Sequence, residues 1–261
     1  MMRNNTSTLG PRRCLDERPR RGMMRDRAAD RRLLWETMFV LAVSLGQSAW
    51  YSILRMIERL TRGVPMNQQT STLNSSVTPG RPWLDLLYQL SDIAFGVVPA
   101  LLAVLLLAQV KPPRQGVRRA LGLEAPGWGR DVGAGAMLAA IIGIPGLGFY
   151  WAAHALGFNT TVRAADLQHV WWTAPVLIGL AGMNAVLEET VMIGYLFTRW
   201  GQIGGSTTMV IVTSAIIRGT YHLYQGWGDF IGNIVMGLFL GWVFSRRCRL
   251  CLLYTSDAAD E

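Results

Sequence analysis

The sequence predicts an all-α protein, specifically a polytopic transmembrane helix bundle. Two observations support this prediction. The 261 residues are 51% hydrophobic and only 16% charged, which is typical of proteins that cross a membrane several times. Six apolar stretches are also long enough to cross a bilayer, and they lie near residues 34–57, 84–110, 132–157, 171–198, 207–224 and 230–245. We expect these to be about six spans out of eight or so in the natural protein.

The connections between these stretches predict how the bundle is oriented. Residues 1–32 form a basic tail, 61–82 a polar loop that we expect to be exposed, and 111–130 a second basic loop. Because positively charged segments stay on the cytosolic side, the amino terminus is expected in the cytosol and the 158–169 connection outside. The outer interface is then expected to carry an aromatic belt, made of Trp50, Tyr51, Tyr150, Trp151, Trp171, Trp172 and Trp227.

The predominance of arginine over lysine suggests the type of organism that the protein comes from. Nearly all of it is arginine, and Lys111 is the only lysine. We interpret this bias as that of a GC-rich bacterial genome and predict a multi-pass protein of the bacterial plasma membrane. The net charge of +8 is accounted for by segments that orient the spans. The lipid bilayer is therefore an expected partner and nucleic acid is not.

Two adjacent carboxylates, Glu188 and Glu189, lie inside the apolar stretch 171–198. A charged side chain at the centre of a bilayer costs about 2.5–3.5 kcal/mol, so a chain that carries two is expected to use at least one of them. His222 lies well along the next stretch, after a short turn. At about 1.5 Å per residue, Glu188 and His222 lie at the same depth to within about one helical turn. We therefore expect the carboxylate and the imidazole to meet inside the membrane.

These motifs resemble the core of a known family. Residues 188–196 read EETVMIGYL and residues 214–222 read SAIIRGTYH. They are similar to two motifs of the CPBP family, the CAAX-type prenyl proteases and bacteriocin-processing intramembrane endopeptidases, which read Glu-Glu-x-x-x-Arg and Phe-x-x-x-His. The resemblance covers residues 170–245, and small residues at 232–241 would let the last helix of this segment pack closely. It implies a hydrolase that cleaves a membrane-associated protein or peptide.

The chain departs from the family pattern at two positions of the site. The family's arginine position holds Ile193, whereas its phenylalanine position holds Arg218. We interpret this as a reciprocal exchange, because Arg218 lies one turn before His222 on the same helix face and can reach the carboxylates from the facing helix. In the alternative, the site is degraded and Arg218 only snorkels towards the surface.

The domain organisation follows from the same comparison. We expect a cytosolic tail at 1–32, accessory transmembrane helices at 33–165 and a protease-like core at 168–250. Residues 251–261 resemble the translated read-through of a sequencing adapter. The family's third motif, His-x-x-x-Asn or Asp, is absent, so we expect the natural protein to continue past Leu250. The chain as given would then have an incomplete site, which can leave it inactive.

The resemblance implies a role for each of four site residues. Glu188 is the candidate general base of a peptidase that activates a water. Glu189 is expected to pair with Arg218, and His222 to position the water. A metalloprotease-type site, with zinc held by Glu188 and His222, and a metal-free Glu–His water both remain open. The motif His-Glu-x-x-His is absent, which excludes the ordinary zincin arrangement.

Other functions are weighed against the endopeptidase. A catalytically inactive protein of the same fold could act as an immunity factor or scaffold, and paired carboxylates could relay protons in a transporter. Residues 226–229 read GWGD, as in aspartyl intramembrane proteases, with Asp92 as the only partner within a span. No Gly-x-Ser-x-Gly occurs, which disfavours a serine site. Asn184, one turn before Glu188, is either a donor to the site or a helix–helix contact.

Overall fold

The computed structural model describes residues 27–109, 128–167, 170–247, 250 and 253. This part is almost entirely helical, which confirms the predicted fold class. Five helices within it are long and apolar enough to cross a membrane: Arg27–Thr61, Pro82–Ala108, Val132–Ala155, Thr173–Gln202 and Trp227–Arg246. Residues 1–26 of the basic tail, most of the second basic loop and most of residues 251–261 lie outside the described residues, whereas residues 27–32 of the tail belong to the first helix.

The helices follow one another as the apolar stretches predict. In chain order they are α1 (Arg27–Leu41), the π-helical η1 (Ala42–Gly46), α2 (Gln47–Thr61), the short 3-10 helix η2 (Met66–Gln68), α3 (Pro82–Ala108), α5 (Trp128–Ala155), α6 (Thr173–Glu188), the π-helical η3 (Glu189–Tyr195), α7 (Leu196–Gln202), α8 (Thr207–His222), the 3-10 helix η4 (Leu223–Gln225) and α9 (Trp227–Arg247). α1, η1 and α2 form one continuous helix, and so do α6, η3 and α7.

The stretch predicted near 207–224 forms α8, but this helix is shorter than a usual span. It has 16 residues and is therefore about 24 Å long, whereas the hydrocarbon core is about 30 Å thick. The helix begins after Ser206, whose hydroxyl accepts a hydrogen bond from the Met209 amide at 3.2 Å. Five of the six expected spans thus reach full length in the described part, and the sixth is a shorter helix.

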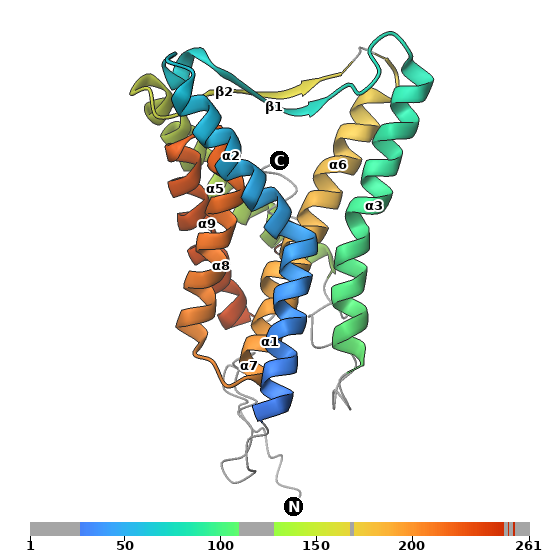
Figure 1. Ribbon diagram of the computed structural model, residues 1–261, viewed down its shortest axis with the longest axis vertical. Helices are drawn as coiled ribbons and strands as arrows, with labels where there is room; N and C mark the ends of the chain where they lie inside the picture. Colours follow the sequence, from blue (N-terminus) through green and yellow to red (C-terminus); the bar gives the residue numbers. More distant parts are fainter. Residues whose placement is uncertain (1–26, 110–127, 168–169, 248–249, 251–252, 254–261) are drawn as a thin grey trace, which may run out of the picture.

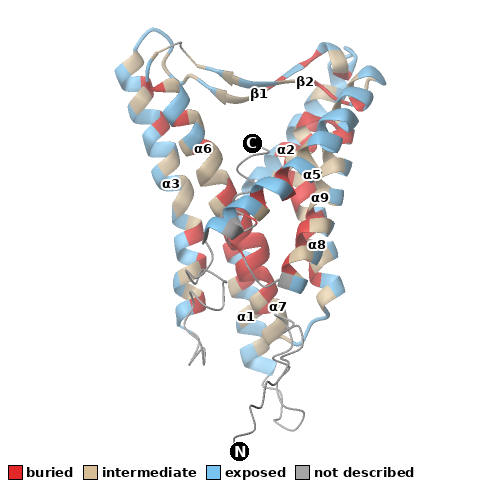
Figure 2. Ribbon diagram, turned by 180° about the vertical axis from the view of Figure 1, so that it is seen from behind, coloured by how far each residue is buried: buried red, intermediate tan, exposed pale blue. Residues whose placement is uncertain are grey.

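The helices form two groups that diverge towards one end of the molecule (Figure 1). α3 and α6 make one group, and α2, α5, α8 and α9 make the other. The groups converge around η3 and α7, where buried residues are concentrated (Figure 2). All seven residues of η3 are buried there. The carboxylate pair therefore lies at the most densely packed part of the bundle.

Two connections that were expected to be plain loops contain strands. β1 (Thr70–Ser75) and β2 (Thr161–Asp166) pair in parallel, with Thr70 opposite Thr161. They cross from one helix group to the other where the groups diverge (Figure 1), and we call this the strand end of the bundle. The expectation of an exposed loop throughout 61–82 was wrong. Neither strand alternates apolar and polar residues regularly, and each depends on a distant partner, so a local pattern could not reveal them.

The ends of the helices alternate as the predicted orientation requires. The start of α1, the turn between α7 and α8 and the end of α9 lie at the end opposite the strands (Figure 1). The connections that carry β1, β2 and η4 lie at the strand end. The assignment of the first of these ends to the cytosol remains a prediction.

The aromatic belt is present in part. The exposed members are Trp50, Tyr51, Trp151, Trp171 and Trp227. Trp172 is only 3% exposed and packs with Val176 and Leu180, so its placement in the belt was wrong. It directly precedes α6, where adjacent side chains point in different directions, and it faces the protein while Trp171 faces outwards.

Small residues on α9 allow it to approach α8 closely, as expected. A Cβ atom on Gly237 would lie 2.9 Å from the Cα of Ala215, and one on Gly241 would lie 3.1 Å from the Ile211 side chain. The first distance is too short for a carbon–carbon contact. The backbones of the two helices can therefore keep their present spacing only while residue 237 has no side chain.

We expect Gly237→Ala to force α8 and α9 apart and to lower the free energy of unfolding by about 1–3 kcal/mol through overpacking. Gly232→Ala on the same helix is the matched control, because its methyl group would lie at an ordinary 3.6 Å from the Phe149 ring. Both variants gain the same helix propensity over glycine. Thermal unfolding of the purified proteins in detergent measures the difference, and equal Tm values would contradict the close approach.

Candidate active site

The four predicted site residues meet where α6 passes into η3 opposite α8. Glu188 is the last residue of α6, and Glu189 is the first residue of η3. Arg218 and His222 lie one turn apart on α8. Glu188, Glu189 and Arg218 are buried, whereas the His222 side chain is 17% exposed. The structure therefore brings all four side chains together, with the histidine as the most accessible.

The helix that carries the carboxylates changes its hydrogen bonding at the pair. From Glu189 to Tyr195 it is a π-helix, in which each amide bonds five residues back rather than four. π-Helical segments are rare in proteins, and those that occur are often found at functional sites. The regular α-helical spacing assumed between Glu189 and Ile193 does not apply here. Ile193 is 1% exposed and belongs to the main hydrophobic core, where its apolar side chain fits.

Arg218 contacts both carboxylates through different nitrogens. Its Nη2 donates a hydrogen bond to Glu189 Oε1, and its Nη1 lies 3.6 Å from Glu188 Oε2. Its side chain is only 2% exposed, so it does not snorkel. A buried carboxylate without an opposite charge is strongly unfavourable. The guanidinium therefore compensates both charges from the facing helix.

Glu188 has a different neighbour at each of its oxygens. The Tyr221 hydroxyl donates a hydrogen bond to Oε2, the oxygen that also faces Arg218. Oε1 lies 3.9 Å from Nε2 of His222. This separation exceeds a hydrogen bond and is a distance that one water can bridge. One oxygen of Glu188 is thus held by the protein, while the other faces the imidazole.

Tyr221 was not predicted from the sequence. Its ring centroid lies 4.8 Å from that of His222, and its hydroxyl reaches Glu188. It follows Arg218 by three residues, a spacing that brings side chains to neighbouring positions on a helix. That spacing was the one signal available, and it could not show that the hydroxyl points at the carboxylate.

The position of His222 is fixed by the turn that follows α8. The Tyr224 amide donates a hydrogen bond to Ser52 Oγ of α2 at 2.7 Å. Gly226 ends the turn with φ 138°, a conformation that favours glycine, and a Cβ there would lie 2.5 Å from the Phe158 carbonyl oxygen. Neighbours on two sides therefore determine where α8 stops and where its last residue, the histidine, is placed.

A second buried ionic cluster holds the other end of η3. Arg199 of α7 pairs with Glu36 of α1 and donates to the Leu106 carbonyl of α3 at 3.0 Å. The Tyr195 hydroxyl donates to Glu36 Oε1 at 2.8 Å. This cluster was not predicted from the sequence, although Glu36 is a further carboxylate inside an apolar stretch. It joins α1, α3 and α7 around the last residue of η3.

The described residues do not by themselves fit a zinc site. Glu188 and His222 offer two protein donors, whereas a catalytic zinc ion usually has three. Across 27–109, 128–167 and 170–247 no group of three His, Cys, Asp or Glu could hold a metal ion. Arg218 also presents its positive charge to both carboxylates. We therefore assign no catalytic step to a metal.

The structure does not assemble the aspartyl alternative. Asp92 lies on α3 and Asp229 near the start of α9, and these helices stand on opposite sides of the molecule in both views (Figures 1 and 2). Two aspartates of an aspartyl protease share one site. Asn184 lies one turn before Glu188 on α6 and is partly buried.

Comparison with known proteins supports the resemblance seen in the motifs. Residues 170–255 match the family model described as type II CAAX prenyl endopeptidase Rce1-like. The match covers about a third of the chain and contains all four site residues. Searches of curated proteins and of solved structures found no match. Residues 170–255 are therefore similar to the Rce1-like type II CAAX prenyl endopeptidases, which is consistent with the resemblance to the CPBP family of intramembrane endopeptidases.

Proposed function

We propose that the chain is an intramembrane endopeptidase of the bacterial plasma membrane, with its amino terminus in the cytosol, that cleaves a membrane-associated protein or peptide. The observation that carries the proposal is the gap of 3.9 Å between Glu188 Oε1 and His222 Nε2 inside the bundle. The match of residues 170–255 to an endopeptidase family supports this class of chemistry.

In the proposed mechanism a water lies between Glu188 Oε1 and the imidazole of His222. Glu188 removes a proton from the water. The water oxygen then attacks the carbonyl carbon of the peptide bond, and the π electrons of the carbonyl group move to its oxygen. When the carbon–nitrogen bond breaks, the proton held by Glu188 passes to the leaving amine. His222 orients the water, and the other oxygen of Glu188 stays fixed by Tyr221.

Glu189 and Arg218 have a supporting role in this proposal. Arg218 stabilises the charged form of Glu188 by placing a positive charge 3.6 Å from its second oxygen, because an opposite charge nearby favours a carboxylate over the neutral acid. Glu189 holds the guanidinium in place through a direct hydrogen bond. The pair thus orients the base without contacting the substrate.

Peptide cleavage in a defined membrane tests the proposal. The chain is reconstituted into phosphatidylethanolamine–phosphatidylglycerol liposomes with two probes, a farnesylated peptide ending in a CAAX sequence and the same peptide anchored by a transmembrane segment. Mass spectrometry identifies the products. Cleavage of either probe by the wild type but not by His222→Ala supports the endopeptidase. If neither probe is cleaved while circular dichroism shows a folded protein, the inactive scaffold or immunity factor is the better description.

The reciprocal exchange of Ile193 and Arg218 leads to a separate prediction. If the exchange is reciprocal, the double variant Ile193→Arg with Arg218→Phe keeps most of the wild-type cleavage rate. This requires the new guanidinium to reach the carboxylates from the core position that Ile193 occupies. The single variant Arg218→Phe is the control and should lose activity. Cleavage rates and Tm values are measured for both. An inactive double variant that remains folded would contradict the exchange.

A further inference from the structure

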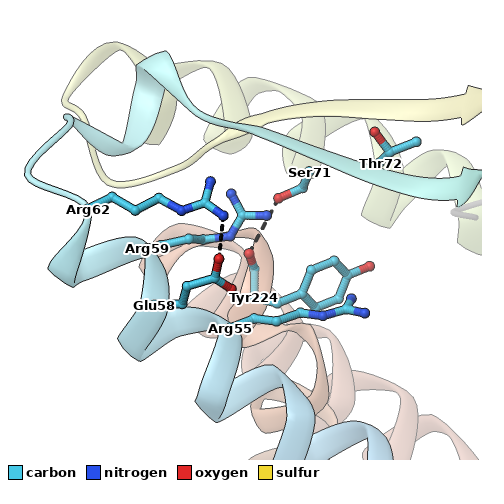
Figure 3. Close-up of a pocket in the computed structure, with 7 residues that line it drawn as sticks. All are labelled: Arg55, Glu58, Arg59, Arg62, Ser71, Thr72 and Tyr224. Carbon is cyan, nitrogen blue, oxygen red and sulfur yellow. Dashed lines mark hydrogen bonds and ion pairs between the residues drawn. The ribbon is translucent and has the colours of Figure 1, made fainter.

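A cavity of about 140 Å³ lies at the strand end, beside the turn that follows His222. Figure 3 shows the residues that line it. It is formed by the end of α2, strand β1 and the turn η4. The residues that line it are Arg55, Glu58, Arg59, Arg62, Ser71, Thr72 and Tyr224. Three arginines and one carboxylate therefore surround a space that the proposed peptidase mechanism does not use.

Only one of these arginines forms an ion pair inside the cavity. Arg62 pairs with Glu58 four residues earlier on the helix, and both side chains are more than half exposed. Neither Arg55 nor Arg59 has a carboxylate partner among the residues that the structure describes. Glu58 also attracts Arg59 and Arg55 at longer range, but one carboxylate cannot balance three guanidinium groups, so the cavity keeps a net positive charge.

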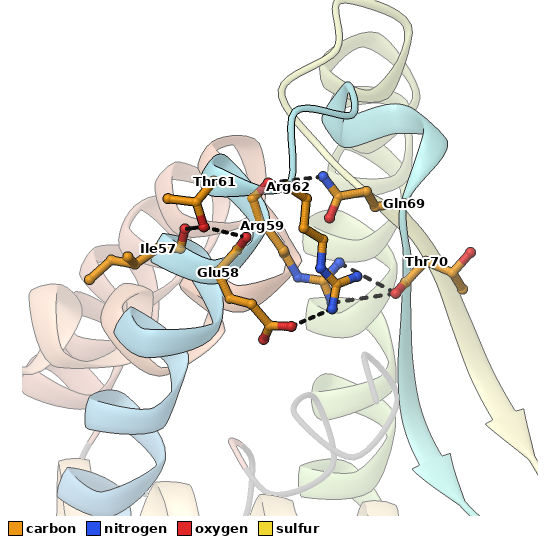
Figure 4. Close-up of polar contacts among 7 residues, drawn as sticks. All are labelled: Ile57, Glu58, Arg59, Thr61, Arg62, Gln69 and Thr70. Carbon is orange, nitrogen blue, oxygen red and sulfur yellow. Dashed lines mark hydrogen bonds and ion pairs between the residues drawn. The ribbon is translucent and has the colours of Figure 1, made fainter.

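Arg55 and Arg59, which form no ion pair with a described carboxylate, are nevertheless held in place. Both terminal nitrogens of Arg59 lie 3.4 Å from the Thr70 carbonyl oxygen of β1 (Figure 4). The guanidinium of Arg55 lies over the Tyr224 ring, 5.7 Å from its centroid. These neutral partners orient the guanidinium groups and leave their charge available to an anion.

Two ordinary explanations do not account for this cluster. Basic residues near the carboxyl end of a helix interact favourably with its dipole, but that effect is confined to the last turn, and Arg55 lies further back. Basic residues that orient a membrane protein gather on the cytosolic side. In the predicted orientation the strand end is the opposite side, so topology does not require arginines there.

The same helix exposes apolar side chains next to the arginines. Trp50, Tyr51 and Leu54 are 60%, 53% and 41% exposed, and Tyr51 lies one turn before Arg55. These side chains lead from the cavity towards the middle of the bundle. A free anion would not need such a surface, whereas acyl chains attached to the anion could lie along it.

We propose that this cavity binds the phosphate group of an anionic phospholipid. Arg55 and Arg59 contact the phosphate, and the acyl chains lie along the exposed apolar side chains of α2. Guanidinium groups suit phosphate oxygens because they donate several hydrogen bonds in a planar arrangement. Basic side chains at a membrane surface are also favourable partners of anionic lipids. The bound lipid links α2 to the turn after His222.

Lipid binding to the delipidated protein in dodecyl maltoside tests the proposal. Native mass spectrometry measures the Kd for phosphatidylglycerol and for phosphatidylcholine, and thermal unfolding follows stabilisation by each lipid and by inorganic phosphate. We expect Arg55→Gln to weaken phosphatidylglycerol binding about fivefold, and Arg55→Gln with Arg59→Gln about 25-fold. The Arg55→Gln variant loses only the ring contact among the interactions described above, so it should remain folded.

Arg81→Gln is the matched control for these variants. Arg81 directly precedes α3 at the same strand end and is exposed, but it does not line the cavity. It should bind phosphatidylglycerol as the wild type does. Unchanged binding in the double variant would overturn the site. Equal stabilisation by inorganic phosphate, or equal affinity for phosphatidylcholine, would overturn the assignment to an anionic lipid.

Discussion

Replacing Glu188 by glutamine is expected to slow peptide hydrolysis about 100- to 10,000-fold, the usual contribution of a general base, and to leave the protein folded. The amide has the shape of the carboxylate but cannot take a proton from a water. Its oxygen can still accept the hydrogen bond from Tyr221. Arg218 keeps Glu189 as its partner, so the variant leaves no charge buried alone.

Glu189→Gln separates the two carboxylates in the same assay. Its direct partner is Arg218, and it has no part in activating the water. We therefore expect a lower Tm than in Glu188→Gln but a smaller loss of kcat/KM. Initial cleavage rates in liposomes and thermal unfolding in detergent give both quantities. If Glu189→Gln abolished hydrolysis and Glu188→Gln did not, the assignment of the base would be wrong.

The features that depend on regular helix geometry could be predicted from the sequence. Apolar stretches of sufficient length predicted the helices, because a backbone in a bilayer must satisfy its own hydrogen bonds. The meeting of Glu188 with His222 was also predictable, because helix length grows by a constant rise per residue and both residues were counted from one turn. The contact of Arg218 with the carboxylates followed from the same counting.

Features that depend on distant partners were not predictable in this way. The π-helix η3 changes the register after Glu189, and no local composition marks it. The pairing of β1 with β2 joins segments separated by two spans. The contact between Arg199 and Glu36 needs the packing of α1 against α7. Each of these features depends on how the helices pack against one another. The periodicity of apolar residues predicts the helices but does not show which of several possible packings they adopt.

Arg218→Met is expected to have the largest effect on stability, a loss of about 3–5 kcal/mol, because it leaves two carboxylates buried without a counter-charge. Glu188 is 6% exposed and Glu189 is fully buried, so water cannot replace the guanidinium. Methionine keeps an unbranched side chain of related length, which limits the cavity that the change creates. Reversible unfolding in a mixed detergent system measures the free energy for the variant and the wild type.

If the loss of stability in Arg218→Met comes from the two buried charges, two further substitutions that remove those charges should restore it. In the triple variant Arg218→Met, Glu188→Gln and Glu189→Gln no charge is buried, and a neutral replacement of a buried ion pair is often tolerated. We therefore expect the triple variant to regain most of the lost stability while remaining inactive. Recovery would show that the guanidinium is needed because of the two carboxylates. If the loss of stability persists in the triple variant, it comes from packing rather than from charge. If Arg218→Met alone loses less than about 1 kcal/mol, the contact of Arg218 with the carboxylates is no stronger than an exposed ion pair.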